Sequence, residues 1–328
     1  YPPELSTTQI YWRAMGGGAE GFVAAPACRH IERFGYVIYT VGIFSLILVT
    51  VLGSGIRGAS RWLDIGPFRF QPSEFTKICL IIVLGKFLHD DPKNEERTLK
   101  DLIIPAILTG VPALLVAKQP DLGTALVHVL IFLAVAAIPR VRRKSMAMAL
   151  GSMAVAIPIV WQFTLPYQRA RVTAFLNPGE DLSGAGYHAY HARIAIGNGG
   201  LFGQGYMQGM QNQYWFLPDQ YSDFPFPVFA EEWGFVGTLV LLSLYGFLVV
   251  WSIRIASQAR DRFGAVVAVG CGAMLFWHTI INLGMASGML PVVGMTPPLF
   301  SYGGGGLGCD LPAGQAVLRG DIRPGAGV

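Results

Sequence analysis

Long apolar segments occupy most of this chain and restrict what it can fold into. A helix that crosses a bilayer needs about 20 mostly apolar residues, and seven segments meet or approach that length. Charged residues make up only 13% of the chain, against about 25% in a typical soluble domain. The sequence therefore predicts an all-α polytopic membrane protein with about seven recognisable transmembrane helices. These helices are expected at about 36–54, 72–89, 102–118, 121–138, 146–164, 225–251 and 264–290.

Basic residues gather in three of the connections between these segments. If successive segments cross in alternate directions, all three connections lie on one side, which the positive-inside rule makes cytoplasmic. A long connection over about 165–224 then faces outward, and we expect short helices there that pack on the membrane domain. The net charge of +4 forms no basic stripe, so no nucleic-acid partner is expected. The three basic groups are Lys86, Lys93, Arg97 and Lys100; Arg140, Arg142, Arg143 and Lys144; and Arg254, Arg260 and Arg262.

Acidic motifs open three of the apolar segments, all on the predicted outer side. Carboxylates at a membrane boundary are costly to desolvate and rarely lie there without a task. We therefore expect a polar site on that side. The motifs are Gln71-Pro72-Ser73-Glu74, Gln119-Pro120-Asp121, and the segment from Tyr214 to Gly237 that carries Asp219, Asp223, Glu231 and Glu232.

Each acidic residue has a structural interpretation beside a functional one. Glu74 and Lys77 are three residues apart, so they can share a helix face and form either a structural ion pair or a cavity wall. Asp121 either caps a helix or lines the cavity. Asp223 is either a general base or the N-cap of the segment that begins near Phe224. Glu231, eight residues further on, can lie on the same helix face as Asp223.

Five motifs in this chain, taken together and in order, resemble the SEDS family of shape, elongation, division and sporulation proteins. Within the family, the RodA-like members match best. The family has ten spans, and the seven segments correspond to its third through ninth. The motifs are RWLDIGPFRFQPSEFTKI (61–78), KQPDLGTAL (118–126), GYHAYHARIAIGNGGLFGQG (186–205), FLPDQYSDFPFPVFAEEWGFVG (216–237) and NLGMASGMLPVVGMTPPLFSYGG (282–304).

The resemblance divides the chain into three parts. Residues 34–306 form the SEDS-like membrane domain, with the long outer loop at about 165–224. Residues 1–33 are an atypical or truncated N-terminal segment, and residues 307–328 are a divergent polar tail. The chain thus looks truncated or altered at both ends.

The resemblance implies a peptidoglycan glycosyltransferase that polymerises lipid II during cell elongation. Asp223 matches the essential aspartate of the family and is expected to act as general base in an inverting displacement. Glu74, Lys77, Asp121 and Glu231 are expected to line or support its cavity. A divalent cation, Mg²⁺ or Mn²⁺, is expected to bridge Asp223 and the substrate pyrophosphate.

Cations on the outer side are needed to bind that pyrophosphate. Arginine suits bidentate phosphate contact, and Arg169 and Arg193 are favoured among the outer cations. The others are Arg57, Arg61, Arg69, Lys118 and Arg171.

The resemblance also implies a class B penicillin-binding protein, a transpeptidase, as partner. The expected location is the bacterial inner membrane, with the active site on the extracytoplasmic side. Two alternatives belong to other functional classes: a flippase or transporter of a lipid-linked precursor, and a scaffold that only recruits the transpeptidase. An FtsW-like division paralogue is the alternative within the family.

Overall fold

The structure is a computed structural model of the chain. It describes residues 28–298 except 57–58, 66–67, 92–96, 139–141, 143, 146, 149–150, 152–157, 159–160, 163, 165, 178–184, 215, 217–222 and 260. The described helices are α2 (Cys28–Arg33), α3 (Gly35–Leu52), α4 (Pro72–Asp90), the 3₁₀ helix η1 (Leu99–Leu102), α5 (Ile103–Lys118), α6 (Leu122–Ala136), α8 (Pro166–Leu176), α9 (Ala185–Asn198), α10 (Met210–Gln213), α11 (Pro225–Gln258) and α12 (Arg262–Ser287).

Six of the seven predicted spans are present as helices, namely α3, α4, α5, α6, α11 and α12. Within the described part of the chain, four helical segments are long and apolar enough to cross a membrane: α3, Leu99–Lys118, α11 and α12. Helix α6 is a shorter apolar helix. The predicted span at 146–164 falls mostly outside the described residues.

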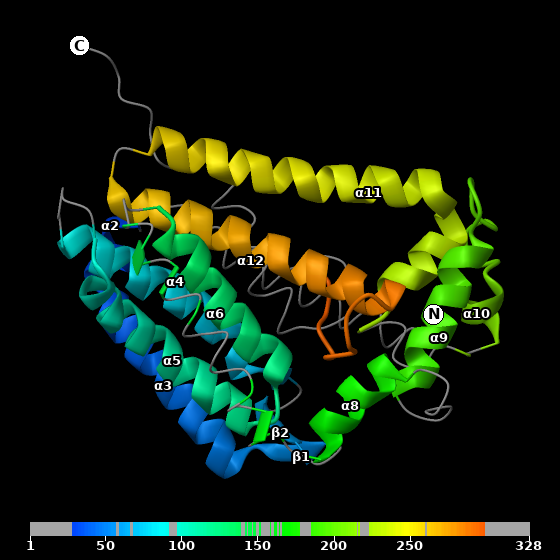
Figure 1. Cartoon of the computed structure of the whole chain (residues 1–328), viewed down its shortest axis with the longest axis horizontal. Coiled ribbons are helices and arrows are strands. Elements are labelled where there is room, and N and C mark those ends of the chain that lie inside the picture. The colour runs from blue at the N-terminus through cyan, green and yellow to red at the C-terminus, as the bar shows by residue number, and fades with distance from the viewer. Residues whose placement is uncertain are drawn as a thin grey trace.

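Helix α4 is the centre of the bundle. It packs against α3, α5, α6 and α12, and Leu80, Val83 and Leu84 are fully buried in the main apolar core. Figure 1 shows α3 to α6 gathered on one side of α12, with α11 running along the other side. A helix surrounded in this way has few positions that face lipid, so it can carry charged residues only where the protein supplies partners for them.

The three basic connections meet at one end of the bundle, as their alternation along the chain predicts. Arg97 Nη2 donates to Asp91 O over 2.9 Å, and Arg142 N donates to Arg97 O over 3.2 Å. Arg262 Nη1 reaches the same Asp91 O at 3.5 Å. Residues from the connections after α4, α6 and α11 therefore share one surface.

A small antiparallel sheet, which the apolar pattern does not foresee, connects α3 to α4. Its strands are β1 (Ser54–Ile56), β2 (Ala59–Ile65) and β3 (Phe68–Phe70), in the order β1-β2-β3. The register pairs Asp64 with Arg69. Backbone pairing within this connection satisfies polar groups that would otherwise need water at the membrane surface.

Helix α11 is broken at Gly234, and a loop from the outer segment repairs the break. Gly234 has φ 65° and ψ −163°, outside helical geometry. The loop after α9 supplies the missing backbone partners on both sides of the break. On one side Gln204 N donates to Glu231 O over 2.9 Å, and on the other Phe235 N donates to Gly200 O over 2.9 Å. A helix can break at membrane depth only where other protein groups replace its lost hydrogen bonds.

Glycines make this backbone-to-backbone contact possible. A Cβ added at Gly203 would overlap the carbonyl of Glu232, and one added at Gly234 would overlap the amide of Gly203. Gly203 also has φ 82°, which side-chain-bearing residues rarely adopt. Gly199 and Gly203 of the GNGGLFGQG stretch therefore serve close packing on α11.

Replacing Gly203 by alanine tests this repair. We expect Gly203→Ala to lower the free energy of unfolding by about 2 kcal/mol or more, through overlap and lost backbone bonds. Gly246→Ala, in the regular part of α11 with open space around its Cα, is the matched control and should be neutral or stabilising. Thermal unfolding in detergent measures both, and equal midpoints would contradict the account.

Candidate active site

The Lys77 side chain lies inside the bundle with all its hydrogens bonded. It is 0% exposed, and its ammonium contacts Glu74 Oε1 at 2.9 Å and Oε2 at 2.8 Å. The third contact, at 2.7 Å, is to Nε2 of His278 on α12. An ammonium has three donors, so the spacing of Glu74 and Lys77 on α4 produces the expected ion pair, and α12 completes it.

A second buried histidine lies beside this group. His128 Nδ1 is 2.8 Å from Thr124 O, and its Nε2 is 3.2 Å from Thr76 Oγ1. Since a carbonyl oxygen only accepts, Nδ1 carries a hydrogen and donates it to Thr124 O. Histidines 128 and 278 stand alone in apolar runs, so no local spacing in the sequence marks them as partners of α4.

The first two acidic motifs lie together at the N-terminal end of α4, next to the Glu74–Lys77 pair. Asp121 caps α6, with Oδ1 accepting from Thr124 N over 3.1 Å. Gln71 Nε2 reaches Asp121 Oδ2 at 3.5 Å and Ser73 Oγ at 3.1 Å. The capping interpretation of Asp121 therefore describes its geometry, and its contribution to a cavity stays a prediction.

Asp223 lies just before α11, and its carboxylate is near a guanidinium. Phe224 holds the N-cap position of α11, so Asp223 lies one residue before the cap. A Cβ added at Gly294 would lie 3.4 Å from Asp223 Oδ2 and 3.6 Å from Arg171 Nη1. The carboxylate and the guanidinium thus both face the backbone of Gly294.

Arg171 and Arg193 line one cleft. The cleft holds about 360 Å³ of space, part of it open to solvent, between α8, α9 and the segment that follows α12. Arg171 Nη1 donates to Val292 O over 3.2 Å, and Arg193 Nε donates to Ala189 O over 3.3 Å. Two arginines in one cleft form a site suited to an anionic group.

Arg169 lies elsewhere. Its guanidinium donates to Gln162 O over 2.8 Å and to Trp161 O over 3.2 Å, and it is not among the residues that line the cleft. Of the two arginines favoured by the sequence, the structure places Arg193 in the cleft. Arg171 takes the other place, although nothing in the sequence distinguishes it from the remaining outer cations.

Glu231 anchors the outer segment. It is 0% exposed, and its Oε1 accepts from Gln211 N over 3.2 Å and from Asn198 Nδ2 over 3.4 Å. Gly209 packs against Oε2. Glu231 therefore binds α9 and α10 to α11, and a supporting role in a cavity remains a prediction. Asp219 lies outside the described residues.

The described residues contain no group of three or more His, Cys, Asp or Glu side chains that could hold a metal ion. Asp223 offers one carboxylate. Magnesium is commonly bound by one or two carboxylates together with substrate phosphates. The site therefore fits a divalent cation whose other ligands come from a bound phosphate group and water.

The buried ion pair generates a stability prediction. Lys77→Met should lower the free energy of unfolding by about 3–5 kcal/mol, because it leaves Glu74 buried without its cation. The double variant Glu74→Gln/Lys77→Met should recover most of that loss. The control is Lys86→Met in the 2.9 Å pair with the 42% exposed Asp90, which should change stability by less than about 1 kcal/mol. Chemical unfolding in detergent measures these, and a double variant no better than Lys77→Met would contradict the prediction.

Comparison with known proteins gives one consistent family. The family described as "Cell cycle protein", which covers FtsW, RodA and SpoVE, matches residues 3–311. The peptidoglycan glycosyltransferase MrdB of Escherichia coli K12 is 43% identical over 280 residues, which cover 85% of this chain and 75% of MrdB.

Solved structures agree. A chain from a peptidoglycan synthase complex that coordinates polymerization and crosslinking superposes with a TM-score of 0.83 at 32% identity, covering 97% of this chain and 90% of that one. The crystal structure of the rod shape determining protein RodA of Thermus thermophilus gives a TM-score of 0.71 at 29% identity, covering 97% of this chain and 88% of RodA. The chain is therefore a multi-pass membrane protein that belongs to the family of FtsW, RodA and SpoVE, the SEDS proteins.

Proposed function

We propose that this protein is a peptidoglycan glycosyltransferase that polymerises lipid II into glycan strands during cell elongation. The observation that carries the proposal is the Asp223 carboxylate, which faces Gly294 together with the Arg171 guanidinium, and Arg171 lines one cleft with Arg193. The 43% identity to MrdB, which bears that activity in its name, supports the reaction class. The structural likeness to RodA supports a role in elongation over one in division.

The reaction needs a base and a site for an anionic leaving group. The acceptor sugar hydroxyl gives its proton to Asp223 as its oxygen forms a bond to the anomeric carbon of the donor. The bond from that carbon to the pyrophosphate oxygen breaks, and the configuration changes from α to β in one displacement. The pyrophosphate leaves with its electron pair and needs neutralisation of charge, which Arg171 and Arg193 supply.

A divalent cation, Mg²⁺ or Mn²⁺, belongs to the proposal as an expectation. Asp223 would hold it together with pyrophosphate oxygens, and its charge would further stabilise the leaving group. The guanidinium groups of Arg171 and Arg193 neutralise charge on the same pyrophosphate.

The location and partner are proposed on the same basis. The shared end of the three basic connections, with Arg97, Arg142 and Arg262, is the cytoplasmic end by the positive-inside rule. With this orientation, Asp223 and the arginine cleft would lie on the extracytoplasmic side of the bacterial inner membrane, where the lipid II headgroup is polymerised. The likeness to a synthase complex supports a class B penicillin-binding protein transpeptidase as partner.

A flippase for a lipid-linked precursor is the alternative from another functional class. It requires ionisable side chains along a path at several depths. The buried charges of α4 instead form a closed ion pair in which every Lys77 donor is used. The arginines of the cleft, Arg171 and Arg193, lie on the outer segment. This arrangement favours chemistry at one surface over transport.

Replacing the base is the direct test. Asp223→Asn should lower the rate of lipid II polymerisation by about 10²- to 10⁴-fold, because an amide cannot accept the proton. Purified protein with a class B transpeptidase and Mg²⁺ or Mn²⁺ provides the assay. Membrane insertion and partner binding should be unchanged. Glycan synthesis by Asp223→Asn at the parent rate would contradict the assignment of Asp223 as the base.

The cleft arginines should control substrate binding. Arg171→Ala and Arg193→Ala should each raise KM for lipid II about tenfold or more, the range expected for a lost charge-assisted hydrogen bond. Arg169→Ala should shift KM by less than about twofold, since that guanidinium binds the carbonyls of residues 161 and 162. The reverse pattern would move the pyrophosphate site to Arg169.

A further inference from the structure

Asn282 of α12 lies behind the Asp223 site and is 1% exposed. Its side-chain nitrogen is 2.9 Å from Asp223 O and 2.7 Å from Met295 O. It follows His278 by four residues, so both residues lie on the same face of α12. That face of α12 therefore contacts the Lys77 ion pair through His278 and, one turn further along, the backbone of Asp223 through Asn282.

Chemistry fixes which atom of the Asn282 amide faces these carbonyls. Both neighbours are carbonyl oxygens, which only accept, so the amide nitrogen and not its oxygen must face them. That nitrogen carries two hydrogens, one for each carbonyl. Leucine has nearly the same shape and no donor, and would leave both carbonyls buried without this partner.

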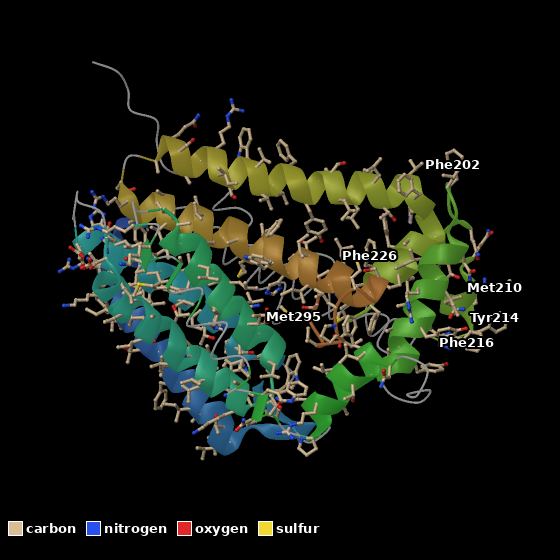
Figure 2. The ribbon with its side chains drawn as sticks, in the orientation of Figure 1. Phe202, Met210, Tyr214, Phe216, Phe226 and Met295 are labelled. Atoms are coloured by element: carbon tan, nitrogen blue, oxygen red, sulfur yellow. The ribbon has the colours of Figure 1, made fainter. Side chains whose placement is uncertain are left out.

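The two carbonyls belong to different segments of the chain. Asp223 leads into α11, whereas Met295 directly follows Gly294, the glycine facing the Asp223 carboxylate and the Arg171 guanidinium. Arg171 Nη1 donates to Val292 O of the same segment, on the other side of Gly294. Figure 2 shows Met295 in the interior, where its side chain belongs to the main apolar core and fills the space beside Gly123.

We infer that Asn282 is a positioning residue that sets the distance between the Asp223 carboxylate and the arginine cleft. The inference rests on the proposed function, because it assigns Asn282 an effect through the base. Asn282 does not touch the substrate. It ties the Asp223 backbone to the 291–296 segment, so that the carboxylate and the cleft keep one geometry. A displacement of about 1 Å at a reacting group costs about 10²-fold in rate.

The test compares Asn282→Leu with Thr279→Val, on the same helix. Thr279 is also buried, but its hydroxyl donates within its own helix, to Leu275 O over 2.8 Å. In the lipid II assay, Asn282→Leu should lower kcat by about 30- to 100-fold with KM changed by less than about twofold, the pattern of a misplaced base. Thr279→Val should keep the parent kcat. Equal kcat values for the two variants would overturn the inference. So would an Asn282→Leu variant whose KM rises while its kcat stays at the parent value.

A second background separates positioning from simple destabilisation. In Asp223→Glu the carboxylate is already displaced by one methylene, so adding Asn282→Leu should cost less than about threefold more. A full additional loss would mean that Asn282 acts independently of the base, and would overturn the inference. Unchanged activity in Asp223→Asn would instead refute the proposed function, which makes the two failures distinguishable.

Discussion

The ammonium of Lys77 needs three acceptors inside an apolar bundle, and the arrangement of α4 and α12 follows from that need. Glu74 supplies two of them from the same helix, and His278 supplies the third from α12. An unpaired charge at this depth is expensive, so the two helices are held in one register. Asn282, one turn beyond His278, then meets the backbone of Asp223.

Backbone groups on the other side of the site also need hydrogen-bond partners inside the protein. Helix α11 breaks at Gly234, and the loop after α9 supplies donors and acceptors to both halves. Glu231, just before the break, binds Gln211 and Asn198. The outer segment that carries the cleft is therefore fastened to a membrane helix by hydrogen bonds. Figure 2 shows the exposed aromatic tips of this segment, Phe202, Tyr214 and Phe216, at the end of the molecule beyond this attachment.

Local pattern was enough to predict the helices and two of the contacts. Apolar length located α3 to α6, α11 and α12 to within a few residues, except that α11 continues to Gln258. The spacing of Glu74 and Lys77 predicted their pairing, and the Gln-Pro-Asp motif predicted a cap at Asp121. All of these depend on residues close in the chain.

The remaining features join residues far apart in the chain, which no periodicity reveals. His278 is 201 residues from Lys77, and Asn282 is 59 residues from Asp223. Arg171 could not be told from Arg169 because only the direction in which each side chain leaves α8 separates them. The break at Gly234 was hidden because glycine is common in membrane helices.

Photo-crosslinking of a lipid II substrate tests most directly whether the cleft lined by Arg171 and Arg193 is the substrate site. A photoreactive residue would replace Leu290, which lines the cleft, and separately Leu114, an exposed position on α5. The account predicts an adduct at position 290 that excess unlabelled lipid II removes, and none at position 114. Equal labelling at both positions, or labelling at 290 that excess lipid II does not reduce, would contradict it.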